Sequence, residues 1–233
     1  SLFAGSGLRS VPAELFSRNP EITAFGKVFT NCVNLTSLPD GLFAANAKVT
    51  VYSNAFEGCT GLQTTGVLFG QSAATVKCDF LFAKCAALQS IPAGMFDGLA
   101  KASTFDQAFI DCAALETIPA GLFKNNTEVT TLTKCFQNCV LLKAVPAQLF
   151  GTSTKTKTLS YLFNGCTSLE SIAPDAFSGL KARRRRSCTL SRNARRSRRF
   201  RTDCSRTTRP YRPGRVCSAT ARGCAKSAPT SST

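Results

Sequence analysis

The chain contains no histidine among its 233 residues. This absence excludes Ser-His-Asp and Cys-His catalysis and every metal site that uses a histidine ligand. No stretch approaches the ~20 uninterrupted apolar residues of a membrane-spanning helix, so the sequence predicts no membrane span. The opening stretch "SLFAGSGLRS" has no basic segment followed by a long apolar run, so we expect no secretory signal there. A glycine-rich phosphate loop, a paired-carboxylate motif and G-x-S-x-G are also missing. The sequence therefore predicts a protein that is not an enzyme and needs no cofactor or metal.

Most of the chain has no net charge, and the excess of positive charge is confined to its end. Residues 1–180 carry 12 Lys and Arg and 12 Asp and Glu, so their charges cancel. Residues 181–233 carry 17 Lys and Arg and a single acid, Asp203, which accounts for the whole net charge of +16. The sequence pI of about 9.7 therefore describes a tail. We expect two parts, a repeat domain over 1–180 and an Arg-rich tail over 181–233.

What the first part does contain is an internal repeat. The motif F-x-x-C-x-x-L occurs six times, and successive motif cysteines lie 27, 26, 27, 27 and 27 residues apart. The single spacing of 26 predicts a one-residue deletion in the third copy, in a loop. We number the repeats 1 to 6 by these motifs and call their cysteines the cysteine column: Cys32, Cys59, Cys85, Cys112, Cys139 and Cys166.

Each copy continues with an aliphatic residue, usually followed by proline, and then with another phenylalanine. A short apolar patch such as Val129-Thr130-Thr131-Leu132 leads into the next motif. One such unit has about six apolar side chains, each worth roughly 1.5–3 kcal/mol on burial. Ordering the unit costs on the order of 40 kcal/mol, so it cannot fold alone. Stacked units cover each other's apolar faces, which predicts a solenoid.

The cysteine column is interpreted first as buried core, because cysteine is a small, apolar and weakly hydrogen-bonding side chain. Disulfides between neighbouring repeats are the next alternative, although stacked strands ~4.8 Å apart hold Cβ atoms further apart than the ~3.8 Å a disulfide prefers. A metal site is the weakest alternative, because residues 1–180 contain neither a C-x-x-C pair nor a histidine. Cys78 and Cys135 lie outside the column and are interpreted as substituted core positions.

Within one unit the sequence predicts short strands and short helical turns. Residues 118–126, "IPAGLFKNN", are expected to form a helical turn, because proline suits the first helical position. Residues 128–132 are rich in β-branched side chains and predict a strand. Residues 133–142 space Phe136, Cys139 and Leu142 three apart, which favours a helical or 3₁₀ turn. The expected fold class is α/β, a leucine-rich-repeat-like solenoid of 26–27-residue units followed by a disordered tail.

The motif F-x-x-C-x-x-L-x-x-[aliphatic], followed by phenylalanine and then Val-Thr, resembles the BspA-like leucine-rich repeat proteins of bacterial surfaces. The stretches "FEGCTGLQ", "FNGCTSLESI" and "NNTEVTTL" carry the resemblance, which covers residues 1–180. It implies a secreted or surface-located protein that makes non-catalytic contacts with host or neighbouring-cell proteins. The start looks like the end of an earlier unit and neither end shows a polar cap, so we expect the chain to be part of a longer array.

One position of the repeat is the candidate for such contacts. The residue that follows each motif leucine changes in charge and type from copy to copy while its neighbours stay similar. Ordinary solvated surface is the alternative interpretation of the same pattern. We call these residues the contact column: Thr36, Gln63, Gln89, Glu116, Lys143 and Glu170.

The tail changes chemistry abruptly after "DAFSGL". Residues 1–180 use ten Lys and two Arg, whereas residues 181–233 use two Lys and fifteen Arg and contain one phenylalanine and one leucine. Such a composition predicts disorder. Three interpretations stay open: an arm that binds nucleic acid or another polyanion with strong salt dependence, a solvated tail without function, and an out-of-frame translation. If the first holds, the protein is an intracellular polyanion binder rather than a surface protein.

Overall fold

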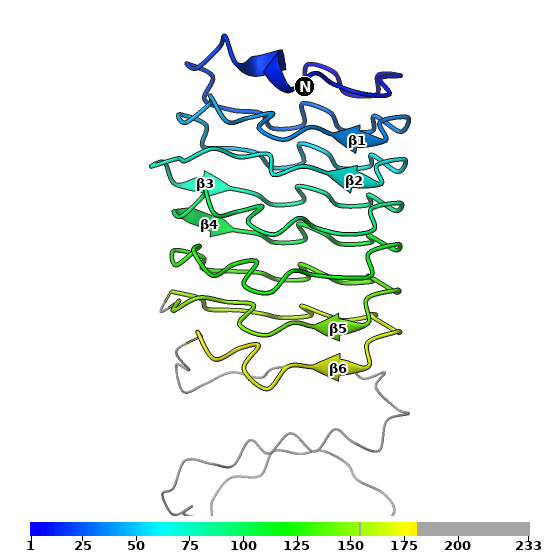
Figure 1. Cartoon of the computed structure of the whole chain (residues 1–233), viewed down its shortest axis with the longest axis vertical. Coiled ribbons are helices and arrows are strands. Elements are labelled where there is room, and N and C mark those ends of the chain that lie inside the picture. The colour runs from blue at the N-terminus through cyan, green and yellow to red at the C-terminus, as the bar shows by residue number, and fades with distance from the viewer. Residues whose placement is uncertain (154, 181–233) are drawn as a thin grey trace, which may run out of the picture. The chain divides into compact units, whose positions relative to one another are not determined.

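The computed structural model describes residues 1–153 and 155–180, so the predicted disordered tail lies outside the described residues. Within residues 1–180 the chain winds into successive repeats that stack on one another (Figure 1). The ordered elements are short. They are the 3₁₀ helix η1 (Ala13–Phe16) and the strands β1 (Ser37–Leu38), β2 (Thr64–Thr65), β3 (Val76–Lys77), β4 (Ala102–Thr104), β5 (Ala144–Val145) and β6 (Ser171–Ile172).

Every strand pairing in the described residues is parallel and joins one repeat to the next. The pairs are β1 with β2, β3 with β4, and β5 with β6. Isolated bridges extend these pairs, and Ser90 to Thr117 continues the line of β1, β2, β5 and β6. A second line of bridges runs from Ala24 through β3 and β4 to Thr158. The predicted solenoid with short strands is therefore confirmed.

The F-x-x-C-x-x-L motif forms consecutive β-turns. The Cys32 N–H donates to the Phe29 carbonyl at 3.1 Å, and the Leu35 N–H donates to the Cys32 carbonyl at 3.1 Å. Intervening amides bond to the next repeat, as the Asn31 N–H does to the Glu57 carbonyl at 2.7 Å. Asn31 has a positive φ of 59°, a conformation that asparagine tolerates. The spacing of three therefore reflects successive turns that share an end residue.

The predicted helical turns were wrong for residues 118–126 and 133–142, and the α/β assignment with them. Both segments form turns, and the described residues contain no α-helix. The physical reason is the use of backbone donors. The Phe123 N–H bonds to the Leu149 carbonyl and the Phe136 N–H to the Leu162 carbonyl, both in the next repeat. A helix would keep these bonds within its own segment. The 128–132 segment contributes only the bridging residue Thr131.

The one-residue deletion lies in a loop. Pairing aligns Leu38 with Thr65 and Phe43 with Phe69, so the missing residue lies between these two positions in repeat 2 and not in the third copy, where it was predicted. In the same loop other repeats have a glycine of positive φ, such as Gly121 at 65°. No residue with positive φ occurs between Thr65 and Phe69. The deletion therefore removes one turn residue and leaves both flanking columns in register.

Phenylalanines form continuous stacks along the solenoid. The motif rings of neighbouring repeats lie 5.2 Å apart for Phe56 and Phe82, with an interplanar angle of 7°, and 5.5 Å apart for Phe82 and Phe109. A second stack joins Phe96 to Phe123 at 5.7 Å. These side chains are almost fully buried. The core is thus a set of identical side chains in register, which couples each repeat to its neighbours.

Two asparagines lie inside this core: Asn126, the last residue of the segment predicted to be a helical turn, and Asn46 at the equivalent position of repeat 1. Asn126 is 2% exposed, and its Nδ2 donates to the Phe96 carbonyl at 2.9 Å and to the Leu99 carbonyl at 2.8 Å. Asn46 makes equivalent bonds to the Phe16 and Asn19 carbonyls. Each amide group therefore ties its turn to the backbone of the preceding repeat.

Replacing Asn126 by alanine is expected to lower the free energy of unfolding by about 1–3 kcal/mol, because two buried carbonyls each lose a donor. The adjacent Asn125 is exposed and provides the matched control. Asn125→Ala is expected to stay within about 0.5 kcal/mol of the parent chain. Urea unfolding of both variants measures the difference, and equal midpoints would contradict a tying role for Asn126.

Candidate protein-contact face

All six residues of the contact column are exposed in the structure. Their backbones form a continuous ladder between repeats. The Gln63 N–H donates to the Thr36 carbonyl at 2.9 Å, the Glu116 N–H to the Gln89 carbonyl at 3.0 Å, and the Glu170 N–H to the Lys143 carbonyl at 2.9 Å. This ladder holds six varied side chains in one line on a hydrogen-bonded support.

The residue after each contact-column residue is exposed as well, and sequence reasoning did not single it out. Five of these six residues carry a hydroxyl group, and the exception is alanine. The signal was present in the sequence as a small residue two positions after each motif leucine. The members of this hydroxyl column are Ser37, Thr64, Ser90, Thr117, Ala144 and Ser171.

The contact column contains one ion pair between neighbouring repeats. Lys143 Nζ lies 2.7 Å from Glu116 Oε2, and the two side chains are 62% and 48% exposed. The hydrogen bond to Glu116, and then the charge of Glu116, raise the pKa of Lys143. An exposed pair of this kind contributes little to stability because solvent screens it. Its effect is to present an acid and a base side by side.

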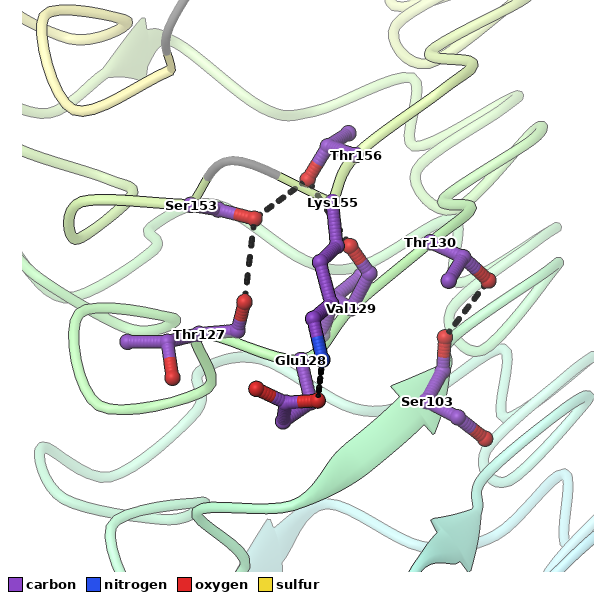
Figure 2. Close-up of polar contacts among 8 residues, drawn as sticks. All are labelled: Ser103, Thr127, Glu128, Val129, Thr130, Ser153, Lys155 and Thr156. Atoms are coloured by element: carbon purple, nitrogen blue, oxygen red, sulfur yellow. Dashed lines mark hydrogen bonds and ion pairs between the residues drawn. The ribbon is translucent and has the colours of Figure 1, made fainter.

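Similar polar contacts join repeats elsewhere on the surface. In Figure 2 Lys155 approaches Glu128, and the Thr156 hydroxyl donates to the Val129 carbonyl of the preceding repeat at 3.0 Å. The Thr130 hydroxyl donates to the Ser103 carbonyl at 3.1 Å in the same view. Three further pairs follow the same order, with the acid in the earlier repeat: Glu21 with Lys48, Glu57 with Lys84 and Asp97 with Lys124. The charged groups of these pairs therefore have partners within the solenoid.

The cysteine column is buried, and each of its thiols donates a hydrogen bond to a backbone carbonyl of the preceding repeat. Cys112 Sγ donates to the Phe82 carbonyl at 3.1 Å, and Cys85 Sγ to the Phe56 carbonyl at 3.2 Å. The other four column thiols donate to the phenylalanine of the preceding repeat in the same way. Each carbonyl also accepts the amide of its own turn, so the thiol occupies the second lone pair. The sequence predicted a buried column but gave no indication of this regular donor role.

Burial also makes the thiols in the middle of the column poor nucleophiles. Loss of solvation raises the pKa of Cys59 to about 12 and raises the pKa of Cys85 and Cys112 as well. They therefore stay protonated at neutral pH, and the thiolate is the reactive form. Cys78 and Cys135 are buried too, and burial raises the pKa of each.

The eight cysteines of residues 1–180 are all free thiols in the structure. Over residues 1–153 and 155–180, no cluster of three or more His, Cys, Asp or Glu is arranged to hold a metal ion. Among those same residues, no helix is both long enough and apolar enough to cross a membrane.

Among known proteins, the chain is similar to several proteins of known structure. No protein-family model and no curated protein matches the chain. A leucine-rich repeat protein of Treponema pallidum is 18% identical, with a TM-score of 0.29, and the match covers 73% of this chain and 68% of that protein. A leucine-rich repeat protein from Bacteroides ovatus is 17% identical, with a TM-score of 0.27 and coverage of 65% and 58%. A leucine-rich cell surface protein from Faecalibacterium prausnitzii is 17% identical, with a TM-score of 0.26 and coverage of 76% and 63%.

Two of these neighbours are named as leucine-rich repeat proteins, the class that the sequence motifs resemble, and the third as a leucine-rich cell surface protein. The chain spans less than two thirds of the Bacteroides and Faecalibacterium proteins. The repeat architecture itself rests on the stacked turns and parallel bridges described above.

Proposed function

We propose that residues 1–180 are a non-catalytic protein-binding module of a bacterial surface or secreted protein. Its contacts are with host or neighbouring-cell proteins, made through the contact column. The observation that carries the proposal is the backbone ladder beneath that column, which holds six exposed and varied side chains in register. A preorganised line of this kind loses little conformational freedom when a protein binds to it. A surface location is in keeping with the name of the Faecalibacterium neighbour.

The second candidate is polyanion binding through the tail. Its supporting observation is the net charge of +16, all of it in residues 181–233. Fifteen arginines attract phosphate in a strongly salt-dependent way. Such binding would need only the tail, so removing the tail distinguishes the two candidate functions.

The test compares the full chain with a variant that ends at residue 180, using immobilised purified extracellular-matrix proteins and a short DNA duplex as probes. We expect matrix-protein binding to survive the deletion and to fall about tenfold or more in a Glu116→Ala, Lys143→Ala double variant. Surface plasmon resonance at two salt concentrations gives the affinities.

A Glu21→Ala, Lys48→Ala double variant is the matched control, because it removes another solvent-exposed ion pair elsewhere on the solenoid. Binding only to DNA, lost on deletion of the tail and weakened by salt, would favour the second candidate. Matrix-protein binding that is equal in both double variants would reject the contact column.

A further inference from the structure

We propose that the contact column and the neighbouring corner of the repeat, formed by the two residues after each motif cysteine, bind a second copy of this chain. The resulting dimer is antiparallel and centred between repeats 4 and 5. This inference rests on the proposed function, since it names a partner for the same face. Three features of this surface support it. An apolar strip is confined to three repeats, and polar side chains border it on both sides. When a twofold axis reverses the order of the repeats, the charges and the side-chain sizes of one copy become complementary to those of the other.

The strip lies at the two positions that follow the motif cysteine. In repeats 3 to 5 both positions are apolar, and Leu141 is 45% exposed. The same positions are polar or glycine in repeat 2, with Thr60 and Gly61, and polar in repeat 6, with Thr167 and Ser168. We call the six apolar residues the apolar strip: Ala86, Ala87, Ala113, Ala114, Val140 and Leu141.

Polar side chains border the strip on each side. The contact column follows it along the chain, with Gln89, Glu116 and Lys143 exposed. On the other side lie Lys84, Asp111 and Asn138, each one residue before a motif cysteine, and Asn138 Nδ2 donates to Asp111 Oδ1 at 2.8 Å. The backbone joins neighbouring strip residues, since the Ala114 N–H donates to the Ala86 carbonyl at 3.0 Å. An apolar centre with a polar rim is the usual anatomy of a protein interface.

Charge order makes the face self-complementary. From repeat 4 to repeat 6 the contact column carries Glu116, Lys143 and Glu170, and Gln89 precedes them without charge. A twofold axis that lies across the repeats between 4 and 5 reverses this order in the second copy. Glu116 then faces Lys143 of the second copy, and Lys143 faces Glu116 of the second copy. Because a twofold interface uses the same patch on both subunits, one acid–base neighbour pair forms two intermolecular pairs.

Side-chain size is complementary about the same axis. Repeat 4 contributes Ala113 and Ala114 to the strip, and repeat 5 contributes Val140 and Leu141. The axis places the larger pair of one copy over the smaller pair of the other. Large side chains over small ones fill an interface without voids. The charge order alone would also fit an axis between repeats 5 and 6, where Lys143 faces Glu170. The strip selects the axis between repeats 4 and 5, because the other axis would place Val140 and Leu141 over the polar Thr167 and Ser168.

Sedimentation velocity of the full chain in reducing buffer, over a wide range of protein concentration, tests the dimer. We expect the parent chain to dimerise reversibly. Glu116→Lys places like charges opposite each other twice per dimer, and it is expected to raise the dimer dissociation constant at least about tenfold. The double variant Glu116→Lys, Lys143→Glu exchanges both charges and is expected to restore the parent value.

Leu141→Glu is expected to give a monomer, and Val33→Glu is its matched control. Val33 is 50% exposed at the corresponding corner of repeat 1, outside the apolar strip, so its replacement is expected to leave the dimer intact. An unchanged thermal midpoint shows that each variant is folded. A parent chain that stays monomeric, or a charge exchange that fails to restore dimerisation, overturns the inference.

Failure of this inference and failure of the proposed function give different results. A monomer that still binds matrix proteins through the contact column rejects the dimer and leaves the proposed function standing. A dimer with the expected charge dependence that binds none of the matrix proteins rejects the adhesive function and supports the inference.

Discussion

Phe82→Ala is expected to lower the free energy of unfolding by about 3–5 kcal/mol, a large part of the stability of a domain of this size. Phe82 is fully buried and stacks between Phe56 at 5.2 Å and Phe109 at 5.5 Å. Its removal opens a cavity in the middle of the motif stack. Because each repeat depends on its neighbours, the loss weakens contacts on both sides of repeat 3.

Urea unfolding followed by far-ultraviolet circular dichroism measures this effect. Tyr161→Ala is the control, since Tyr161 is 48% exposed and its ring contacts Lys134 Nζ at 5.9 Å from the centroid. We expect this control to change stability by less than about 1 kcal/mol. A Phe82→Ala variant as stable as the control would show that the phenylalanine stack does not couple the repeats.

The second large effect is unfolding in mild alkali. Burial raises the thiol pKa of Cys59 to about 12, and it raises the pKa of Cys78, Cys85, Cys112 and Cys135 as well. In the unfolded chain these thiols ionise near pH 9 or just below. Between that pH and the folded-state values the folded chain binds more protons than the unfolded chain. Stability is therefore fully present below about pH 8.5 and falls as the pH rises.

The slope is steep because several thiols act together. Each thiol that is ionised only in the unfolded chain costs about 1.4 kcal/mol per pH unit. Five such thiols are enough to remove most of a typical folding free energy of about 5–15 kcal/mol between pH 9 and pH 11. Tyr52, whose pKa is raised by burial, acts in the same direction.

Urea unfolding at a series of pH values, with a reducing agent present, measures the slope. Cys85→Ser is the matched variant, because serine can still donate to the Phe56 carbonyl and does not ionise in this range. The slope of its free energy of unfolding against pH is expected to be smaller than that of the parent chain by about 1.4 kcal/mol per pH unit. A parent chain with constant stability from pH 8 to pH 10.5 would contradict the buried, protonated thiols.

The candidate face was only partly visible in the sequence. The contact column stood out because Glu116 and Lys143 differ while the flanking leucines repeat, and the structure places this column at the surface. The hydroxyl column escaped notice, because Ser90 or Thr117 taken alone resembles any polar strand residue. The apolar strip was not predicted either, because apolar residues such as Ala113 and Val140 next to a buried cysteine are expected to be buried as well. Exposure separates these cases, and it depends on which way each turn faces.

The sequence by itself determined the repeat, its length and the identity of the buried columns, because stacking requires the same apolar positions in every copy. Only the tertiary structure decided the backbone. A spacing of three between Phe136, Cys139 and Leu142 fits a helical turn and a series of β-turns equally well. The choice depends on where the amide hydrogens bond, and here the Phe136 N–H finds its acceptor, the Leu162 carbonyl, in another repeat. No local pattern contains that partner, since the neighbouring repeat supplies it only once the chain has stacked.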